Sequence, residues 1–257
     1  MFAIERLGKI KEILLKQKRV DVYELSELFS VTEVTIRRDL DKLEQAGFLV
    51  KIYGGAVLNE ESEPDALSPA SENDAYLEQK RMIGKIAGQM IENGDAIYLS
   101  PGTTCLEIAR NLKNKRVTVV TNDMAIGFAL KDSAGIKVIV TGGDLMPSTS
   151  TLVGGFAQQA LDGIFINKAF IGIKGAHMDA GYTVGSHEEV MVIHSVKKIS
   201  NEVIVVADYS KFNTTGFARL GDLNMTKKVI TNKQVPSDYK KLYFENAVKL
   251  YTTFELE

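Results

Sequence analysis

One stretch of sequence decides the fold of the N-terminal part of this chain: Val31-Thr32-Glu33-Val34-Thr35-Ile36-Arg37-Arg38-Asp39-Leu40. On a helix of about 3.6 residues per turn, Ile36 and Leu40 fall on one side. Arg38 points almost directly away from that side, and Arg37 and Thr35 flank it. A helix that reads the major groove needs this combination, because its apolar back docks on its own domain while its front reaches phosphates and base edges.

The segments before and after this stretch fit a small helical domain. Apolar residues recur at spacings of three and four over residues 2–17, which predicts an amphipathic helix. Asp21 is expected to cap a second helix that runs to about Phe29. Thr32 is expected to cap the third helix, because its hydroxyl accepts from open amides of the first turn, and Gly47 to end it.

Two short strands around a glycine turn are predicted next, over residues 49–53 and 54–58. Three helices and a hairpin make a winged helix-turn-helix, in which Lys51 and Tyr53 of the wing are expected to touch backbone phosphates. A domain of this kind can also serve as a protein–protein module, and the residues alone leave that alternative open.

Net charge does not decide between these alternatives. Residues 1–58 contain 10 Lys or Arg and 9 Asp or Glu, which is a weak positive balance for a nucleic-acid-binding domain. The positive charge is therefore expected to be local, at Arg37, Arg38, Lys51 and the cluster Lys16, Lys18 and Arg19. Asp39 falls toward the buried side, so we expect it to pair or cap inside the domain.

Several spaced positions match a known pattern together: Thr35-Ile36-Arg37-Arg38-Asp39-Leu40, Leu43-Glu44 and Gly54-Gly55-Ala56. They resemble the DNA-binding signature of the DeoR family of bacterial transcriptional regulators. The family usually has Ser where this chain has Thr32, and both residues cap helices. The resemblance implies sequence-specific DNA binding, with contacts expected from Thr32, Thr35, Arg37, Arg38 and Lys51.

The whole chain has ordinary soluble composition, with 257 residues, 45% hydrophobic and 25% charged. No apolar run approaches the roughly 20 residues that span a bilayer, and Glu5 and Arg6 interrupt any signal-peptide core. Cys105 is the only cysteine, so an intrachain disulfide is impossible. We therefore expect a cytoplasmic protein with no membrane contact, no metal and no cofactor.

A domain boundary follows the hairpin. Residues 59–79 contain seven Asp or Glu, two Pro and no Lys or Arg, a composition that cannot bury enough apolar surface to fold alone. The expected organisation is a winged helix-turn-helix DNA-binding domain at 1–58, an acidic linker at 59–75 and a larger domain at 76–257.

Strand-like and helical segments alternate in the larger domain. The predicted strands are residues 96–100, 117–121, 136–141, 168–173, 203–207, 228–231 and 248–252, and the predicted helices lie near 76–92, 103–113, 123–132, 152–162 and 187–199. Short Val- and Ile-rich runs separated by helices favour an α/β domain with a mostly parallel sheet covered on both faces. Ligands of such sheets sit beyond the carboxyl ends of the strands.

Small and polar residues follow the predicted strands. Gly102-Thr103-Thr104 follows the first strand and opens a helix, where a glycine permits close approach and exposed amides bind anions. The other strand ends carry Thr121-Asn122-Asp123, Thr141-Gly142-Gly143-Asp144, Lys174-Gly175 and Asp208-Tyr209-Ser210-Lys211. One such end is an ordinary turn, but their succession indicates a pocket for a polar, phosphorylated small molecule.

The resemblance to the DeoR family extends through this domain. The matching residues include Lys80, Gly102-Thr103-Thr104, Val119-Val120-Thr121-Asn122, Gly142-Gly143-Asp144, Ala169-Phe170-Ile171-Gly172 and Ala207-Asp208-Tyr209-Ser210-Lys211-Phe212. The family's effector domain resembles sugar-phosphate isomerases in fold and senses phosphorylated sugars. The motif match therefore implies effector contacts from Lys80, Gly102, Thr103, Thr104, Asp208 and Lys211. Many members have Asp shortly before Gly-Thr-Thr, where this chain has Ser100-Pro101.

The resulting hypothesis is a repressor of a sugar-utilisation operon that a phosphorylated sugar releases from operator DNA. A homo-oligomer, dimer or tetramer, is expected because operators mirror two-fold protein symmetry. The alternative is a sugar-phosphate isomerase-like enzyme with an accessory module, which needs a general base. Residues 173–177, where such an enzyme would be expected to have acidic residues, contain none. A nucleotide-binding protein is disfavoured, because the chain has neither a Gly-x-Gly-x-x-Gly helix start nor a Walker motif.

Overall fold

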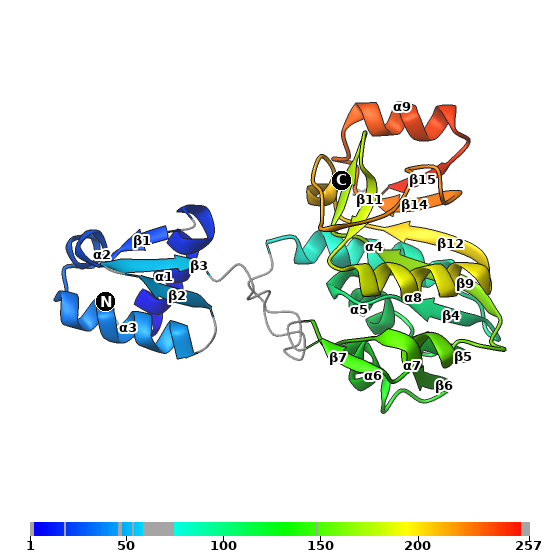
Figure 1. Cartoon of the computed structure of the whole chain (residues 1–257), viewed down its shortest axis with the longest axis horizontal. Helices are drawn as coiled ribbons and strands as arrows, with labels where there is room; N and C mark the ends of the chain where they lie inside the picture. Colours follow the sequence, from blue (N-terminus) through cyan, green and yellow to red (C-terminus); the bar gives the residue numbers. More distant parts are fainter. Residues whose placement is uncertain are drawn as a thin grey trace. The chain divides into compact units, whose positions relative to one another are not determined.

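The structure, a computed structural model, describes residues 3–17, 19–45, 48–52, 54–58, 75–146 and 149–252. The chain forms two compact units, Met1–Asp65 and Ala66–Glu257 (Figure 1). Residues 59–74 of the predicted linker lie outside the described residues, as do Gly47 and Tyr53.

The N-terminal unit contains three helices and a three-stranded antiparallel sheet. Its elements are α1 (Ala3–Gln17), β1 (Arg19–Asp21), α2 (Val22–Phe29), α3 (Glu33–Gln45), β2 (Leu49–Ile52) and β3 (Gly55–Leu58). The sheet order is β1-β3-β2. The three predicted helices and the predicted hairpin are confirmed. Strand β1 was not predicted, because three residues are too few to show an alternating pattern.

The apolar faces of the three helices meet in one core. Ile10 and Leu14 of α1, Leu25 of α2, and Ile36 and Leu40 of α3 are all at most 2% exposed. These residues recur at the helical spacing seen in the sequence, so burial of the stripe fixes which side of α3 faces outward.

The C-terminal unit is an α/β domain. Its helices are α4 (Leu77–Gln89), α5 (Thr103–Arg110), α6 (Met124–Leu130), α7 (Gly154–Gln159), α8 (His187–Lys198), the 3-10 turn η1 (Tyr209–Lys211) and α9 (Ser237–Glu245). Its strands are β4 (Ala96–Leu99), β5 (Val117–Thr121), β6 (Ile136–Val140), β7 (Asp144–Met146), β8 (Thr151–Val153), β9 (Ile166–Gly172), β10 (Gly175–His177), β11 (Gly181–Val184), β12 (Ser200–Val206), β13 (Ala218–Gly221), β14 (Lys228–Thr231) and β15 (Lys249–Thr252).

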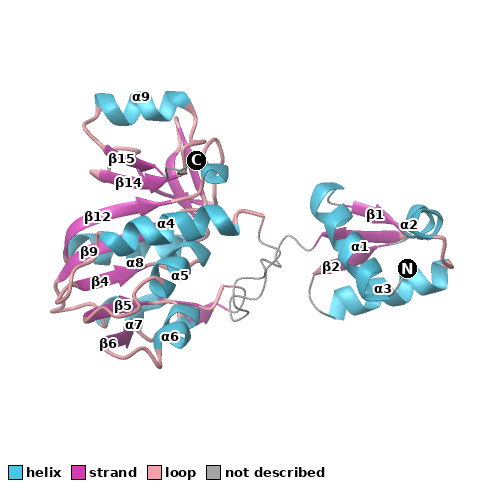
Figure 2. Ribbon diagram, turned by 180° about the vertical axis from the view of Figure 1, so that it is seen from behind, coloured by secondary structure: helices cyan, strands magenta, loops and turns pink. Residues whose placement is uncertain are grey.

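A seven-stranded sheet of order β15-β14-β12-β9-β4-β5-β6 forms the centre of this unit. Figure 2 shows the strands in this succession. Every neighbouring pair is parallel, so the predicted mostly parallel sheet is confirmed. All seven predicted strands and all five predicted helices are present, with ends that differ by a few residues.

Both faces of the sheet are buried. In β4, Ile97 and Leu99 join an apolar cluster with α4, α5 and α6, while Tyr98 joins a second cluster with α7, α8 and α9. Successive side chains of a strand point to opposite faces. The two clusters therefore cover opposite faces, which explains why the strands read as continuous apolar runs.

Three features of this unit were not predicted from the sequence. Helix α9 packs Tyr239 and Tyr243 into the second cluster. Strands β10, β11 and β13 form an antiparallel sheet, and β7 and β8 form a hairpin. Each of these five strands has only three or four residues, which is too short for periodicity to identify it.

No helix in the described part of the chain combines the length and apolar character that spanning a bilayer requires.

Candidate nucleic-acid interface and ligand site

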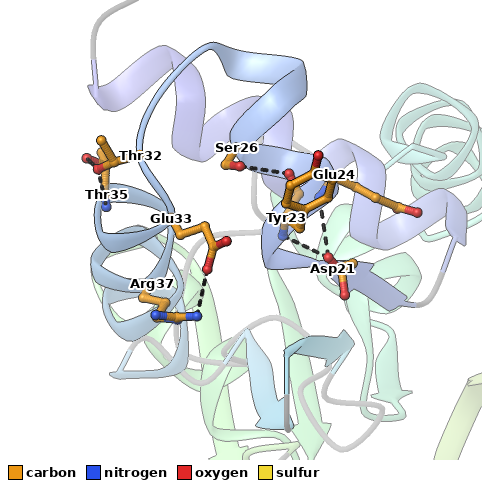
Figure 3. Close-up of polar contacts among 8 residues, drawn as sticks. All are labelled: Asp21, Tyr23, Glu24, Ser26, Thr32, Glu33, Thr35 and Arg37. Carbon is orange, nitrogen blue, oxygen red and sulfur yellow. Dashed lines mark hydrogen bonds and ion pairs between the residues drawn. The ribbon is translucent and has the colours of Figure 1, made fainter.

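Two threonine hydroxyls, from Thr32 just before α3 and from Thr35 in its first turn, meet at the start of this helix. Thr32 Oγ1 accepts a hydrogen bond from the Thr35 amide at 3.3 Å and lies 3.0 Å from Thr35 Oγ1 (Figure 3). Thr32 therefore acts as the N-terminal cap that the sequence predicted. Asp21 caps α2 in the same way, since its Oδ1 accepts from the amides of Tyr23 and Glu24 at 2.7 and 3.3 Å.

The outward face of α3 carries Val34, Arg37 and Arg38, all exposed. Arg37 donates to the Glu33 carboxylate at 2.7 Å, one turn earlier on the same helix (Figure 3). Arg38 has no ion pair within the described residues. The two arginines of the signature therefore differ: the guanidinium of Arg37 is held along the helix, and that of Arg38 is open to solvent.

Lys51 of the wing is paired with α3. Its ammonium contacts the carboxylates of Asp41 and Glu44, and its amide donates to Glu44 Oε1 at 3.0 Å. The hydrogen bond to Asp41 raises the pKa of Lys51, and the charge of Glu44 acts in the same direction. Lys51 thus joins β2 to α3, and a phosphate contact from Lys51 must compete with two carboxylates. Tyr53 and the side chains of Lys16 and Lys18 lie outside the described residues.

In the C-terminal unit, the structure brings Lys80 and Thr103 together. Lys80 lies on α4 and is only 8% exposed. Its ammonium donates to Thr103 Oγ1 at 2.8 Å, at the first residue of α5. Gly102 precedes α5 with φ of 120°, a conformation that side chains rarely adopt. The carboxyl end of β4 thus brings the Lys80 ammonium, the Thr103 hydroxyl and the start of α5 together.

Asp123 lies beside this loop; the sequence placed it at a strand end but did not include it among the expected effector contacts. Its Oδ2 accepts from the Gly102 amide at 3.0 Å, and its Oδ1 caps α6 by accepting from the Ala125 amide at 2.7 Å. Burial raises the pKa of Asp123, and these amide donors oppose the rise. Asp123 therefore supplies a carboxylate beside the Gly-Thr-Thr loop. Ser100, which directly follows β4, is buried, and its Oγ accepts from the Gly172 amide at 2.8 Å.

The turn after β12 holds a buried carboxylate. Asp208 is fully buried, and its Oδ1 accepts from the Ser210 amide at 2.9 Å. Its Oδ2 has no hydrogen-bond partner within the described residues. A buried polar oxygen without a hydrogen-bond partner is costly in a folded protein and calls for an explanation. Lys211 is half-buried at the end of the same turn.

Asn232 links this turn to the helix of Lys80. Its Nδ2 donates to the Gln79 carbonyl at 3.2 Å, and its Oδ1 accepts from the Tyr209 amide at 3.2 Å. The rings of Tyr76 and Tyr209 also meet edge-to-face, with centroids 5.5 Å apart. The predicted effector residues from α4, from the end of β4 and from the end of β12 are thus connected through α4. Asn232 directly follows β14, so the strand-end rule applied to that strand would have found it.

A hollow of about 520 Å³ lies elsewhere on the unit, between α7 and α8, and is lined by Gln158, Met191, His194, Ser195, Lys197 and Lys198. The C-terminal part of α8 leads into the start of β12, so this hollow is at the amino edge of the sheet and contains none of the predicted residues. Among the described residues, no group of three or more His, Cys, Asp or Glu side chains is placed to hold a metal ion.

Family models match both units. Residues 6–62 match the DeoR-like helix-turn-helix domain, and residues 76–233 match the DeoR C terminal sensor domain. The chain belongs to the DeoR family. It is therefore a DeoR-type helix-turn-helix transcriptional regulator, as the sequence motifs predicted.

Relatives align along almost their whole length. The HTH-type transcriptional repressor GlcR of Bacillus subtilis is 30% identical, with 98% of this chain and 97% of the relative covered. The lactose phosphotransferase system repressor of Staphylococcus epidermidis is 30% identical, with 89% and 91% covered. The HTH-type transcriptional regulator GolR of Listeria innocua is 30% identical, with 94% and 95% covered.

Among solved structures, ribose 5-phosphate isomerase A of Methanocaldococcus jannaschii matches with a TM-score of 0.41 and 18% identity, over 54% of this chain and 55% of the isomerase. Translation initiation factor eIF-2B of Pyrococcus horikoshii matches with a TM-score of 0.41 and 18% identity, over 84% of this chain and 73% of the factor. These likenesses are too distant to bear on function.

Proposed function

We propose that the protein represses a sugar-utilisation operon, binding operator DNA through α3 and leaving it when a phosphorylated sugar binds the C-terminal unit. The observation that carries the DNA part is the outward face of α3, where Arg38 is exposed opposite the buried Ile36 and Leu40. The names of two relatives, a lactose phosphotransferase system repressor and the repressor GlcR, support regulation of sugar genes.

The division of labour on α3 follows from its ion pairs. Arg38 has an open guanidinium that suits bidentate contact with guanine O6 and N7. Arg37 shares its charge with Glu33 at 2.7 Å, so we assign it to a phosphate, for which exact orientation matters less. Thr32 and Thr35 sit at the helix start, where amides and hydroxyls suit a phosphate oxygen.

The strand-end residues offer complementary groups for a phosphorylated sugar. A phosphate dianion suits the Lys80 ammonium and the start of α5, where Lys80 and Thr103 are 2.8 Å apart. A sugar hydroxyl suits the unpartnered Oδ2 of buried Asp208 as a donor. Lys211, Gly102 and Thr104 complete the proposed contacts. A single molecule that carries both a phosphate and hydroxyls is complementary to both kinds of group.

Release from DNA then requires differential affinity. An effector shifts the DNA-binding equilibrium only by the difference between its affinities for the two states. A shift from ~1:99 to ~99:1 needs roughly 5.5 kcal/mol. Two to four charge-assisted contacts, each worth about 1.5–3 kcal/mol, supply that difference if they form in one state only. We propose a homo-oligomer, dimer or tetramer, because two-fold symmetric operators pair with two-fold symmetric proteins.

We propose that the C-terminal unit senses its ligand without turnover, and that the protein acts in the cytoplasm. Isomerisation needs a base beside the reacting carbon, and residues 173–177 offer no carboxylate. Incubation of the full chain with pentose and hexose phosphates, followed by analysis for the isomerised sugar, tests this. Product formed in proportion to protein would replace the sensing role with the enzymatic alternative.

A single experiment tests the regulatory proposal. Selection from a random duplex library with the full chain is expected to yield a two-fold symmetric sequence. Titration of that complex with a panel of sugar phosphates, each beside its unphosphorylated sugar, is expected to show release by a phosphorylated member only. Failure to select any sequence overturns the DNA part. Release by the free sugar, or by none of the panel, overturns the effector part.

A further inference from the structure

Val34 is an exposed aliphatic side chain at the second residue of α3. It is 65% exposed, while Ile36, two residues later, is fully buried. The partly buried apolar residues that pack on the N-terminal core include Val31 and Phe48 and do not include Val34. Within the described residues, the fold of this unit therefore does not use the side chain of Val34.

The position of Val34 on the helix places it beside Arg38. Residues four apart on a helix are neighbours on one face. Their side chains emerge about 6 Å apart along the axis, because the rise is about 1.5 Å per residue. The other exposed cation of this turn, Arg37, is held by Glu33 at 2.7 Å. The exposed strip at the amino end of α3 therefore places one aliphatic group beside a guanidinium that has no ion pair among the described residues.

We propose that Val34 is a specificity-determining residue that packs against the C5-methyl group of a thymine in the operator; this inference rests on the proposed function. Recognition helices of the helix-turn-helix class contact base edges through their amino-terminal residues. An aliphatic side chain has no donor or acceptor, and the thymine methyl is the apolar group that base edges present in the major groove. Val34 therefore favours A·T or T·A over G·C at its position.

The spacing of Val34 and Arg38 fixes where that thymine lies. Base pairs are stacked about 3.4 Å apart, so side chains about 6 Å apart along the helix address base pairs at most about two steps apart. If Arg38 reads a guanine, the thymine read by Val34 lies within about two base pairs of it in each half-site. This arrangement predicts a short T-and-G element in the operator.

Replacement of thymine by uracil in the operator tests the contact, because it removes the C5-methyl group and changes no hydrogen-bonding group. The full chain is first used to select its operator, and each thymine of one half-site is then replaced singly. Loss of one buried methyl contact weakens binding about fourfold. We expect this loss for wild type at one thymine near the guanine of Arg38. Val34→Ala is expected to bind the thymine operator several-fold more weakly than wild type. Its affinity should not fall further when that thymine is replaced by uracil.

Val140→Ala is the matched control, since Val140 is 41% exposed on β6 of the other unit and should retain the full thymine effect. Thermal unfolding of Val34→Ala should match wild type, because the side chain is exposed. The inference is overturned if no thymine replacement weakens wild-type binding, or if Val34→Ala keeps the wild-type sensitivity. Failure of wild type to select any sequence removes the proposed function itself, so the two failures are distinguishable.

Discussion

The Nε of Arg6 lies 2.5 Å from Oδ2 of Asp39, and this ion pair joins α1 to α3 while both side chains are more than nine-tenths buried. Asp39 follows Arg37 and Arg38 in the signature, yet it faces the opposite way. The pair therefore fixes the rotation of α3 and, with it, the direction in which Arg38 points.

Removing one partner of this pair should loosen the N-terminal unit. Asp39→Ala leaves the Arg6 charge buried without a partner, which typically costs about 3–5 kcal/mol. We expect hydrogen exchange of α3 amides to accelerate at least 100-fold, while amides of β4 and β9 are unchanged. The double variant Arg6→Leu, Asp39→Leu should recover most of the protection, since an apolar pair replaces a buried ion pair at little cost. Unchanged α3 exchange in Asp39→Ala would contradict the structural role of the pair.

The two exposed arginines of α3 should both matter for DNA binding, but differently. Arg38→Ala is expected to abolish or strongly weaken operator binding and to relax selectivity at one base pair. Loss of one base contact reduces the binding free energy by about 1–3 kcal/mol. Arg37→Ala is expected to weaken binding to all sequences alike and to lower the salt dependence by about one ion. Anisotropy titrations at several salt concentrations measure both effects. Arg219→Ala, an exposed arginine of the other unit, is the control, and wild-type affinity in either α3 variant removes that arginine from the interface.

Local patterns in the sequence predict the elements of this fold well. The stripe containing Ile36 and Leu40 gave the inward face of α3, and Asp21 and Thr32 were correctly predicted as caps. These features depend on residues within a few positions of one another, so spacing and side-chain chemistry are sufficient to find them. Short strands such as β10 were not predicted, because they form only where a partner strand is already in place.

The arrangement of the strand-end site could be predicted only in part. The sequence placed Gly102, Thr103 and Asp208 at strand ends, and a parallel sheet brings such ends to one edge. The contacts of Asn232 with Gln79 and of Asp123 with Gly102 join residues 153 and 21 positions apart. These contacts depend on strand order, which places β5 beside β4 and β14 beside β12, and local patterning does not encode strand order.

The acidic segment should be the first place that a protease cuts. Residues 59–79 contain Glu but no Lys or Arg, and their composition predicts a linker. A glutamate-specific protease is expected to cut between about Asn59 and Asp74 and to leave a stable C-terminal fragment, identified by its mass. Trypsin is the built-in control, because it has no site between Lys51 and Lys80. First cuts by the glutamate-specific protease inside residues 80–257 would mean that the chain is divided differently.

Asp95 should make the C-terminal unit sensitive to acid. Burial opposes ionisation of Asp95, but the Glu92 amide at 2.9 Å and the Lys168 ammonium at 2.6 Å outweigh it and hold the pKa of Asp95 below its usual value. A carboxylate with a lowered pKa stabilises the fold above its unfolded pKa of about 3.9, and this stability is lost as pH falls through the folded value. Asp95→Asn is therefore expected to lower the free energy of unfolding by about 1–2 kcal/mol at pH 7. Near pH 3 the difference in unfolding free energy between the variant and wild type should be smaller, because the wild-type carboxylate is then losing its charge.

Urea unfolding at pH 7 and near pH 3 measures this effect. Asp132→Asn is the control, because its side chain is 89% exposed and lies 3.9 Å from Lys131, a surface pair of small worth. It should follow wild type at both pH values. A gap between Asp95→Asn and wild type that stays constant from pH 7 to pH 3 would show that the carboxylate charge is not what stabilises this corner of the sheet.

Loss of an effector contact should leave the protein bound to its operator, so the regulated genes should stay repressed. Lys211 ends the η1 turn that begins beside Asp208, and we assign it to the effector phosphate together with Lys80 and the start of α5. Loss of one charge-assisted contact costs about 1.5–3 kcal/mol, or about 10- to 150-fold in effector affinity. Lys211→Ala should therefore bind operator normally but need correspondingly more sugar phosphate for release, so that the regulated genes stay repressed. Lys241→Ala, whose side chain is 78% exposed on α9, should respond as wild type does. Operator complexes of the three proteins titrated with the active sugar phosphate decide the point, and equal sensitivity of Lys211→Ala and wild type would remove Lys211 from the site.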